Sequence, residues 1–251
     1  EPTGPVRWEV DALPLVLAAD DWAVLERGLV QRSRVLDALL ADLYGPQRTL
    51  TTGLLPPELV FGHPGYLRAA HGVTLPGPHQ LFIHAVDVAR HRDGSFRAIR
   101  DHTQAPSGLG YAMAVFFFNA TATTEIYTTA GPRPLAPFGH ALRLALRDVA
   151  PSGVEDPFVV VLSPGAQSET AFDQAHLASV LGVPLVESAD LTVREGRLWM
   201  RSLGSLTRVD VVMRRIDADY ADPLDLRRDS RLGVVGLVEV VRRGGVSLVN
   251  P

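Results

Sequence analysis

The sequence predicts an α/β fold, and three observations carry that prediction. Apolar residues recur with helical spacing over residues 20–44 and 135–149. Short apolar runs flank Asp93-Gly94, a dipeptide typical of tight hairpin turns. A strand, a helix and a second strand then follow in close succession over residues 158–187. That order is typical of two parallel strands joined by a crossover helix.

Composition narrows the class of protein. The chain has 251 residues, of which 46% are hydrophobic and 21% charged, enough to bury the core of one large or two modest domains. Its 24 basic and 28 acidic residues are spread along the chain and give a net charge of −4, so we expect no nucleic-acid partner. No secretory segment is visible, and no apolar run approaches the roughly 20 residues of a membrane helix. We therefore expect a cytoplasmic protein without a membrane partner.

Two residue types are missing, and both absences limit the chemistry. Without cysteine, the chain has no disulfide, thiolate metal site or cysteine nucleophile. All 24 basic residues are arginine, so it has no lysine to hold a phosphate or form a Schiff base. A single arginine is more often a solvated surface charge than a ligand.

The first half of the chain begins with a helix and continues to a hairpin. Asp20 is the expected cap of the helix over residues 20–44, and Gly45-Pro46 ends it. Turn-rich connectors fill residues 58–79. Strands over residues 81–90 and 95–100 then form the hairpin. Residues 116–129 show neither period, so no element is assigned to them.

The second half carries the parallel strands. After the helix over residues 135–149 we expect a buried strand at 158–162, a helix at 169–181 and a strand at 184–187. The loop over residues 163–169 then lies at a strand's carboxyl end, where α/β proteins bind ligands.

The remaining elements complete the predicted order. They are a hairpin around Glu195-Gly196, an interior strand at 209–213, a helix at 232–243 and a last strand at 246–249. The sequence stops just after that strand, so we expect a longer polypeptide. We divide the chain into a helical and loop segment (1–80), a hairpin and helix region (81–150) and a βαβ subdomain (151–251).

Candidate metal ligands come from the hairpin. With its turn at Asp93-Gly94, Asp87 and Asp101 fall nearly opposite each other on one face. Facing carboxylates repel unless they share a proton or a cation, so a hard metal ion is a sensible third party. The alternative is that both are exposed edge charges. The scattered histidines lack the spacing of a metal-binding pair on one helix face.

Two further groups are candidate ligands for an anion. Thr103, Ser107 and Gly108 follow Asp101 in a loop of small residues that suits close backbone approach to an anion, although an ordinary turn explains them equally well. Arg214 and Arg215 directly follow a predicted strand and could receive a carboxylate or phosphoryl group in bidentate fashion. The alternative is pairing with the aspartates that come after them.

Several short segments, in this order, resemble one family over nearly the whole chain. They are Leu43-Tyr44-Gly45-Pro46-Gln47, Pro56-Pro57-Glu58-Leu59-Val60, Asp101 with Thr103-Gln104-Ala105-Pro106-Ser107-Gly108, Gly110-Tyr111-Ala112, Val160-Val161-Leu162-Ser163-Pro164-Gly165, Ser168-Glu169, Arg214-Arg215-Ile216-Asp217, Asp222-Pro223-Leu224, and Asp229-Ser230 with Leu232-Gly233. The family that they resemble is the circularly permuted ATP-grasp proteins of the alpha-E-associated type, of which this chain looks like the N-terminal portion.

The resemblance implies a fold, an activity and site roles. The fold is ATP-grasp-like, a mixed sheet with flanking helices plus the βαβ subdomain. The activity is an ATP-dependent carboxylate–amine ligase that forms amide or peptide bonds from an acid and an amine, with ATP and Mg²⁺ as cofactors and an alpha-E protein as a partner. Asp87 and Asp101 are then Mg²⁺ ligands, and Arg214 and Arg215 are catalytic. In the same comparison the loop with Thr103, Ser107 and Gly108 meets the cofactor.

Two departures from the family pattern shape the expectation for this chain. Ala114-Val115-Phe116 stands where such proteins have Glu-Asn-Arg, and the run to Pro134 matches nothing expected. The lysines with which ATP-grasp folds hold phosphates are missing, so we expect no ATP turnover by residues 1–251 alone. Two alternatives remain: a noncatalytic binding subunit for an alpha-E partner, and a carboxylate- or sugar-binding α/β module without nucleotide chemistry.

Overall fold

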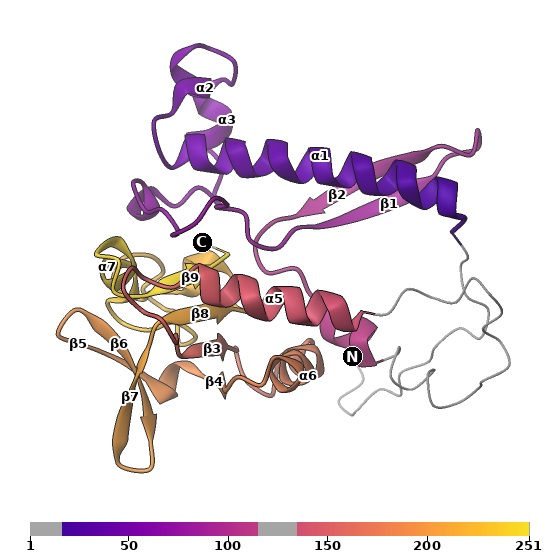
Figure 1. Ribbon diagram of the computed structural model, residues 1–251. Helices are drawn as coiled ribbons and strands as arrows, with labels where there is room; N and C mark the ends of the chain where they lie inside the picture. The colour runs from indigo at the N-terminus through magenta and orange to yellow at the C-terminus, as the bar shows by residue number, and fades with distance from the viewer. Residues whose placement is uncertain (1–16, 115–134, 251) are drawn as a thin grey trace, which may run out of the picture.

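A parallel four-stranded sheet lies at the centre of the computed structural model, which describes residues 17–114 and 135–250 (Figure 1). Its strands, in spatial order, are β4 (Leu185–Val186), β3 (Val159–Leu162), β8 (Val211–Arg214) and β9 (Ser247–Val249). Each neighbouring pair is parallel. Helix α6 (Ala171–Leu181) connects β3 to β4, so the predicted βαβ unit is confirmed.

The sheet is buried on both faces because alternate residues of each strand enter different cores. Val161, Val211 and Met213 pack on one face with α6 and α5 (Ala136–Asp148). Val160 and Val212 pack on the other face, among residues of the second sheet and of α7 (Leu237–Arg242). Because both faces are buried, consecutive residues of β3 are apolar, which explains the apolar run at residues 158–162.

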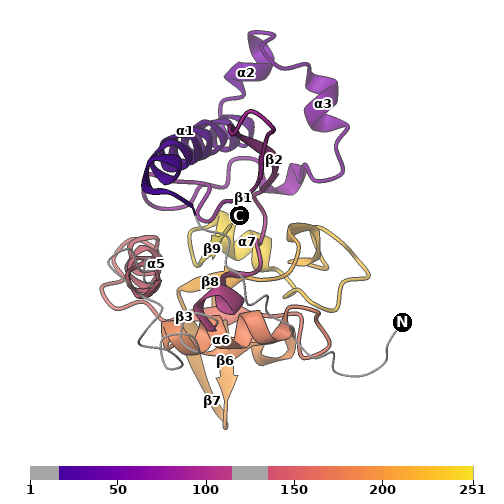
Figure 2. The ribbon, with the colours of Figure 1, turned by 90° about the vertical axis from the view of Figure 1, so that its right-hand side faces the viewer.

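The second sheet is antiparallel and covers one face of the first. It consists of β5 (Leu191–Arg194), β6 (Arg197–Ser202) and β7 (Ser205–Val209), in that order. Leu198 and Val209 pair across β6 and β7 and point into the core. Figure 2 shows β6 and β7 on the side of the parallel sheet opposite to α1 (Ala19–Leu43).

A third sheet, a two-stranded hairpin, lies beside α1 (Figures 1 and 2). It consists of β1 (Ala85–Arg90) and β2 (Phe96–His102), which confirms the predicted hairpin. The remaining short elements are α2 (Arg48–Thr51), α3 (Pro57–Phe61), η1 (Arg68–Ala70), η2 (Ser188–Asp190) and η3 (Ala218–Tyr220). The unassigned segment 116–129 lies outside the described residues.

Four predictions about elements were wrong in detail. Ala18, not Asp20, precedes α1, and Ala18 makes no side-chain cap. The strand expected at residues 209–213 is the end of β7 and the start of β8, separated by Asp210. The helix expected at 232–243 begins only at Leu237, after Gly236 with φ of 80°. Among the described residues each sheet is wholly parallel or wholly antiparallel, so the expected mixed sheet is not found.

Asp222 explains where α7 begins. Its buried carboxylate accepts hydrogen bonds from the backbone N–H groups of Gly236 (3.1 Å) and Val238 (3.0 Å) at the start of that helix. It also accepts one from the backbone of Leu224 (2.8 Å). A carboxylate at a helix N-terminus satisfies donors that the helix itself leaves free. The Asp222-Pro223-Leu224 motif therefore has a structural role.

Within residues 17–114 and 135–250, every helix is too short or too polar to span a lipid bilayer. The division into segments 1–80, 81–150 and 151–251 stays a prediction.

Candidate functional site at the strand ends

The carboxyl ends of β3, β8 and β9 meet at one edge of the parallel sheet, where α/β proteins commonly bind ligands. The chain leaves these ends at Ser163, Arg215 and Asn250. All three residues are buried. The sequence places Ser163 and Arg215 at strand ends, but only the parallel pairing brings them to the same edge.

Arg214 ties two of these strand ends together. Its buried guanidinium donates from Nε (3.2 Å) and Nη2 (2.8 Å) to the carbonyl oxygen of Asn250, and from Nη1 to that of Ile216. Burial lowers the pKa of Arg214 to about 10, against the attraction of Asp217. This guanidinium, which was predicted to bind a carboxylate, donates its hydrogen bonds to backbone carbonyl oxygens. Its catalytic role stays a prediction.

Arg215 points to the other face of the sheet, toward α6. Its Nη2 donates to Oδ2 of Asp173 at 3.1 Å, and both side chains are buried. Burial lowers the pKa of Arg215, and the charge of Asp173 opposes that shift. Its buried Nε has no hydrogen-bond partner in the described structure. A buried donor without a partner costs free energy, so this N–H is a candidate contact for an anionic ligand.

Asp173 fixes the next segment against α6. Its Oδ1 accepts hydrogen bonds from the backbone N–H groups of Gly110 (2.6 Å) and Tyr111 (3.3 Å), at the start of a helical segment over residues 109–114. A Cβ at position 110 would lie 2.2 Å from the carbonyl oxygen of Asp173, so only glycine fits. Sequence reasoning missed Asp173, although the Gly110-Tyr111-Ala112 motif marks the contact from its other side.

Asn250 holds the connection from the hairpin over the strand ends. The two N–H groups of its Nδ2 face three carbonyl oxygens, those of Ile83 (2.7 Å), Gln104 (2.8 Å) and Thr103 (3.1 Å), and its Oδ1 accepts from the N–H of Ile83 (2.7 Å). Arg214 binds the carbonyl of the same Asn250. Predicted site residues Thr103 and Arg214 are therefore brought together by a residue that the sequence did not single out.

The predicted anion-binding loop lies in this region with its side chains open to solvent. Thr103 and Ser107 are exposed. Gly108 has φ of 101°, and its carbonyl accepts the N–H of Ala112 in the helical segment 109–114. Space around a Cβ at position 108 is free, so the backbone conformation alone requires glycine there. Contact of these residues with a phosphate stays a prediction.

A buried polar network lines the β3 end of the site. Ser163 Oγ donates to Oε1 of Gln174 at 2.5 Å and accepts the N–H of Gly165 at 3.0 Å. The amide nitrogen of Gln174 donates to the hydroxyl of Thr170 at 2.9 Å. These bonds fix the loop between β3 and α6, so the backbone at this strand end is preorganised.

The predicted facing pair of Asp87 and Asp101 was wrong. Asp87 pairs with Arg100, and Asp101 pairs with Val86. Adjacent strand positions point to opposite faces, so the two carboxylates cannot share one cation. The reason is a register shift after Asp87, where the pairing moves from Arg100 to Ala98 and leaves Ile99 as the extra residue of a bulge.

Each carboxylate instead has its own partners. Asp101 accepts from Nε (2.6 Å) and Nη2 (2.5 Å) of Arg32 on α1 and lies 3.0 Å from Nε2 of His84. These contacts, Arg32 first, lower the pKa of Asp101 to about 2 although burial raises it. Asp87 is 58% exposed, and its Oδ2 lies 3.0 Å from Nε2 of His102.

Asp87 and Asp101 do not form a shared Mg²⁺ site. No group of three or more His, Cys, Asp or Glu side chains suited to a metal ion occurs within residues 17–114 and 135–250. The carboxylate that is best placed, Asp101, is already neutralised by Arg32. Whether Asp87 or Asp101 alone contacts a metal ion stays a prediction.

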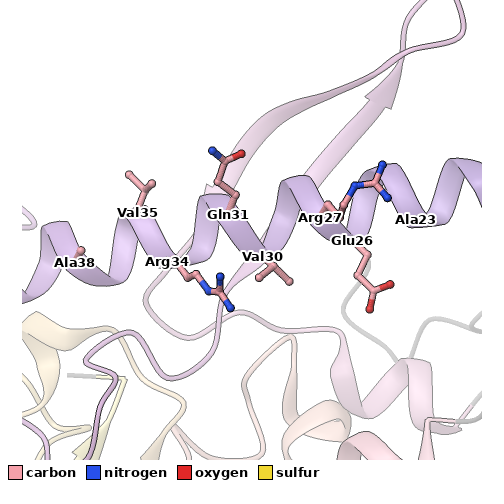
Figure 3. Close-up of a pocket in the computed structure, with 8 residues that line it drawn as sticks. All are labelled: Ala23, Glu26, Arg27, Val30, Gln31, Arg34, Val35 and Ala38. Carbon is pink, nitrogen blue, oxygen red and sulfur yellow. The ribbon is translucent and has the colours of Figure 1, made fainter.

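A groove of about 600 Å³ along α1 lies apart from the strand ends (Figure 3). Its lining side chains all come from that one helix: Ala23, Glu26, Arg27, Val30, Gln31, Arg34, Val35 and Ala38. None of the predicted site residues lines it, so we place the candidate site at the strand ends.

Fold and site together define an α/β protein whose parallel sheet presents buried arginines at its carboxyl edge, beneath a connecting loop. The chain belongs to the family described as circularly permuted ATP-grasp type 2, which matches residues 14–251. The resemblance seen in the short motifs is thereby confirmed.

Relatives of the chain are longer proteins. An uncharacterized protein of Mycobacterium tuberculosis is 65% identical over 246 residues, which are 98% of this chain and 28% of that protein. Uncharacterized proteins of Synechocystis and Mycobacterium leprae are 37% and 36% identical, over 96% and 94% of this chain. The chain spans 50% and 42% of their lengths. It therefore corresponds to part of each relative.

Proposed function

We propose that the chain is part of an ATP-dependent carboxylate–amine ligase and supplies the platform on which an anionic group of a substrate is held. The main support is the buried Nε–H of Arg215 at the carboxyl edge of the sheet, which has no hydrogen-bond partner among the described residues. Membership in the ATP-grasp family supports the reaction class. In this reaction a carboxylate oxygen takes the γ-phosphoryl group of ATP and releases ADP, and an amine then displaces phosphate from the acyl phosphate.

Each predicted residue has a distinct place in this proposal. In this proposal Arg215, which is held by Asp173, donates a hydrogen bond to the carboxylate or phosphoryl oxygen. Arg214 fixes the carboxyl ends of β8 and β9 relative to each other through its bond to the carbonyl oxygen of Asn250. The exposed hydroxyls of Thr103 and Ser107 are free to contact ATP from the loop. In this proposal Asp87 or Asp101 contributes at most one Mg²⁺ ligand, because the two carboxylates lie on opposite faces of the hairpin. The protein is proposed to work in the cytoplasm on small acids and amines.

The test uses the full-length polypeptide that carries these residues. With Mg²⁺-ATP and a panel of carboxylic acids, hydroxylamine in place of the amine should trap the acyl phosphate as a hydroxamate while ADP is released. Ser107→Ala should raise the KM for ATP severalfold, because the exposed hydroxyl is lost without disturbing the fold. Ser152→Ala is the matched control, an exposed turn serine before β3 at the opposite end of the strands.

Three outcomes separate this proposal from its rivals. Hydroxamate formation that depends on an acid supports the ligase. Nucleotide binding without ADP release would instead indicate a noncatalytic subunit, such as one that binds an alpha-E partner. Stabilisation by acids but not by Mg²⁺-ATP in a thermal-shift screen would indicate a carboxylate-binding module. Residues 1–251 alone should release no ADP, and steady release by that purified chain would contradict the proposal.

A further inference from the structure

The outer face of the β5–β6–β7 sheet gathers four arginines around a tryptophan. Register places Arg194 opposite Arg197, and Trp199 between Thr192 and Arg208. Arg201 pairs with Leu206 in the next outward row. The alternating inward residues, such as Leu198 and Val209, fill the core, so these side chains share the outward face. Figure 1 shows this sheet projecting from the rest of the molecule.

Most of the positive charge on this face is unmatched. Arg194, Arg197 and Arg201 are exposed and make no ion pair with any residue that the structure describes. Only Arg208 has one, to Asp210 at 2.9 Å. No outward position of the three strands carries a carboxylate. Two arginines directly opposite each other destabilise a sheet, so this arrangement favours an anionic partner.

The centre of the face is apolar and partly buried. Trp199 is held in place by its indole N–H, which donates to the carbonyl oxygen of Arg194 at 3.2 Å. Leu206 is 37% exposed. Tryptophan and arginine are the residue types that contribute most to protein–protein interfaces, particularly where an apolar centre has a polar rim. This face has that composition.

We propose that the outer face of β5–β7 binds an acidic segment of a partner protein. Carboxylates of the partner pair with Arg194, Arg197 and Arg201, and an apolar side chain covers Trp199. A nucleic acid is less well matched, because stacking of successive bases needs several aromatic side chains and this face has one. The proposal is argued from the charge and register of this face alone, so it does not depend on the ligase activity.

The experiment measures binding of a fluorescein-labelled peptide with alternating glutamate and leucine residues to the full chain, by anisotropy in low salt. Replacing two exposed arginines by glutamine in R197Q/R201Q should weaken peptide binding about tenfold relative to wild type, since each lost ion pair contributes a modest free energy. R92Q/R228Q is the matched control, because it removes the same charge from two exposed arginines elsewhere. Its affinity should change less than twofold.

Further arms decide the partner class. Raising the salt to 0.5 M should weaken peptide binding by the wild-type chain, because screening acts on exposed charges. A lysine–leucine peptide of equal length should not bind. Three results would each overturn the proposal: an equal loss of peptide affinity in the two double variants, no binding of the acidic peptide, or tighter binding of a single-stranded oligonucleotide. Unchanged thermal unfolding of both variants shows that the fold is intact.

Discussion

At the scale of single residues, Asp101 gives the clearest prediction about pH. Arg32 and His84 lower its folded pKa to about 2, whereas an unperturbed aspartate has a pKa of about 3.9. A lowered folded pKa stabilises the fold above the unfolded value, and the stabilisation is lost as pH falls from about 4 through 2. Asp101→Asn should therefore lower the urea midpoint at pH 7, and the difference from wild type should shrink over that pH window.

Asp87→Asn is the matched control for this experiment. That carboxylate lies on the same hairpin but is mostly exposed, so its replacement should leave the urea midpoint nearly unchanged. An Asp101→Asn difference that stays constant between pH 4 and pH 2 would contradict the assigned ion pair.

Residue identities at the site could be predicted only in part. Arg214 and Arg215 were identified because they directly follow an apolar strand, which is local information. Asp173 and Asn250 could not be, because their partners Gly110 and Thr103 lie 63 and 147 residues away in the sequence. The prediction that Asp87 and Asp101 share one face was wrong because of a single bulged residue. A register shift of one position moves a side chain to the opposite face of the hairpin.

At the scale of elements, Gly110 determines how closely the helical segment 109–114 packs on α6. A Cβ at this position would lie within 3 Å of three backbone atoms of Asp173, which cannot move as a flexible side chain can. Gly110→Ala should therefore lower the free energy of unfolding by more than about 2 kcal/mol, measured by urea denaturation.

A second glycine substitution provides the control. Gly28 lies in α1, and a Cβ at this position would meet no atom within 4 Å. Gly28→Ala should therefore stabilise the fold by about 0.5–1 kcal/mol through helix propensity. Similar effects of the two substitutions would show that close packing does not determine the cost at position 110.

Elements with a strong local period were predictable, and those set by distant contacts were not. The helix at residues 20–44 and the βαβ unit follow from apolar spacing alone. The break between β7 and β8 comes from Asp210, whose N–H bonds to the carbonyl of Phe158 and whose carboxylate accepts the N–H of Phe158 at 3.1 Å. An apolar run gives no indication of such a contact.

At the scale of the whole molecule, Asn250 connects the parallel sheet to the segments on either side of the hairpin. Asn250→Ala removes the side-chain hydrogen bonds to Ile83, Thr103 and Gln104, which an amide with two N–H groups and one oxygen makes. The backbone N–H of Ile83 and the loop over residues 103–110 should then exchange hydrogen faster, with a loss of about 3 kcal/mol in stability. Hydrogen–deuterium exchange measures both effects.

Gln80→Ala tests whether this response is specific. Gln80 also makes two hydrogen bonds through its amide, but both go to Leu75 only five residues away. Faster exchange should stay near residue 75 in that variant. If it spread to residues 103–110 as well, Asn250 would have no special role in joining the parts.

Periodicity gave the α/β class, and the family motifs added the more specific relationship. Those motifs predicted an ATP-grasp relationship, which the match over residues 14–251 confirms. Strand order could not be predicted. β3 and β8 are neighbours in the sheet, but in the sequence the strands of the antiparallel sheet lie between them. Parallel pairing between distant segments depends on the packing of the two cores, and no local pattern encodes it.

The order in which the parallel sheet is synthesised has a consequence for folding on the ribosome. β8 is an inner strand with β9 as one neighbour, and Asn250 just after β9 contacts Ile83, 167 residues earlier. Most of the chain must therefore emerge before the sheet can close. Contacts of such long sequence separation slow folding and leave apolar strands accessible meanwhile. Nascent chains stalled before residue 247 should bind chaperones longer than chains that have been released from the ribosome.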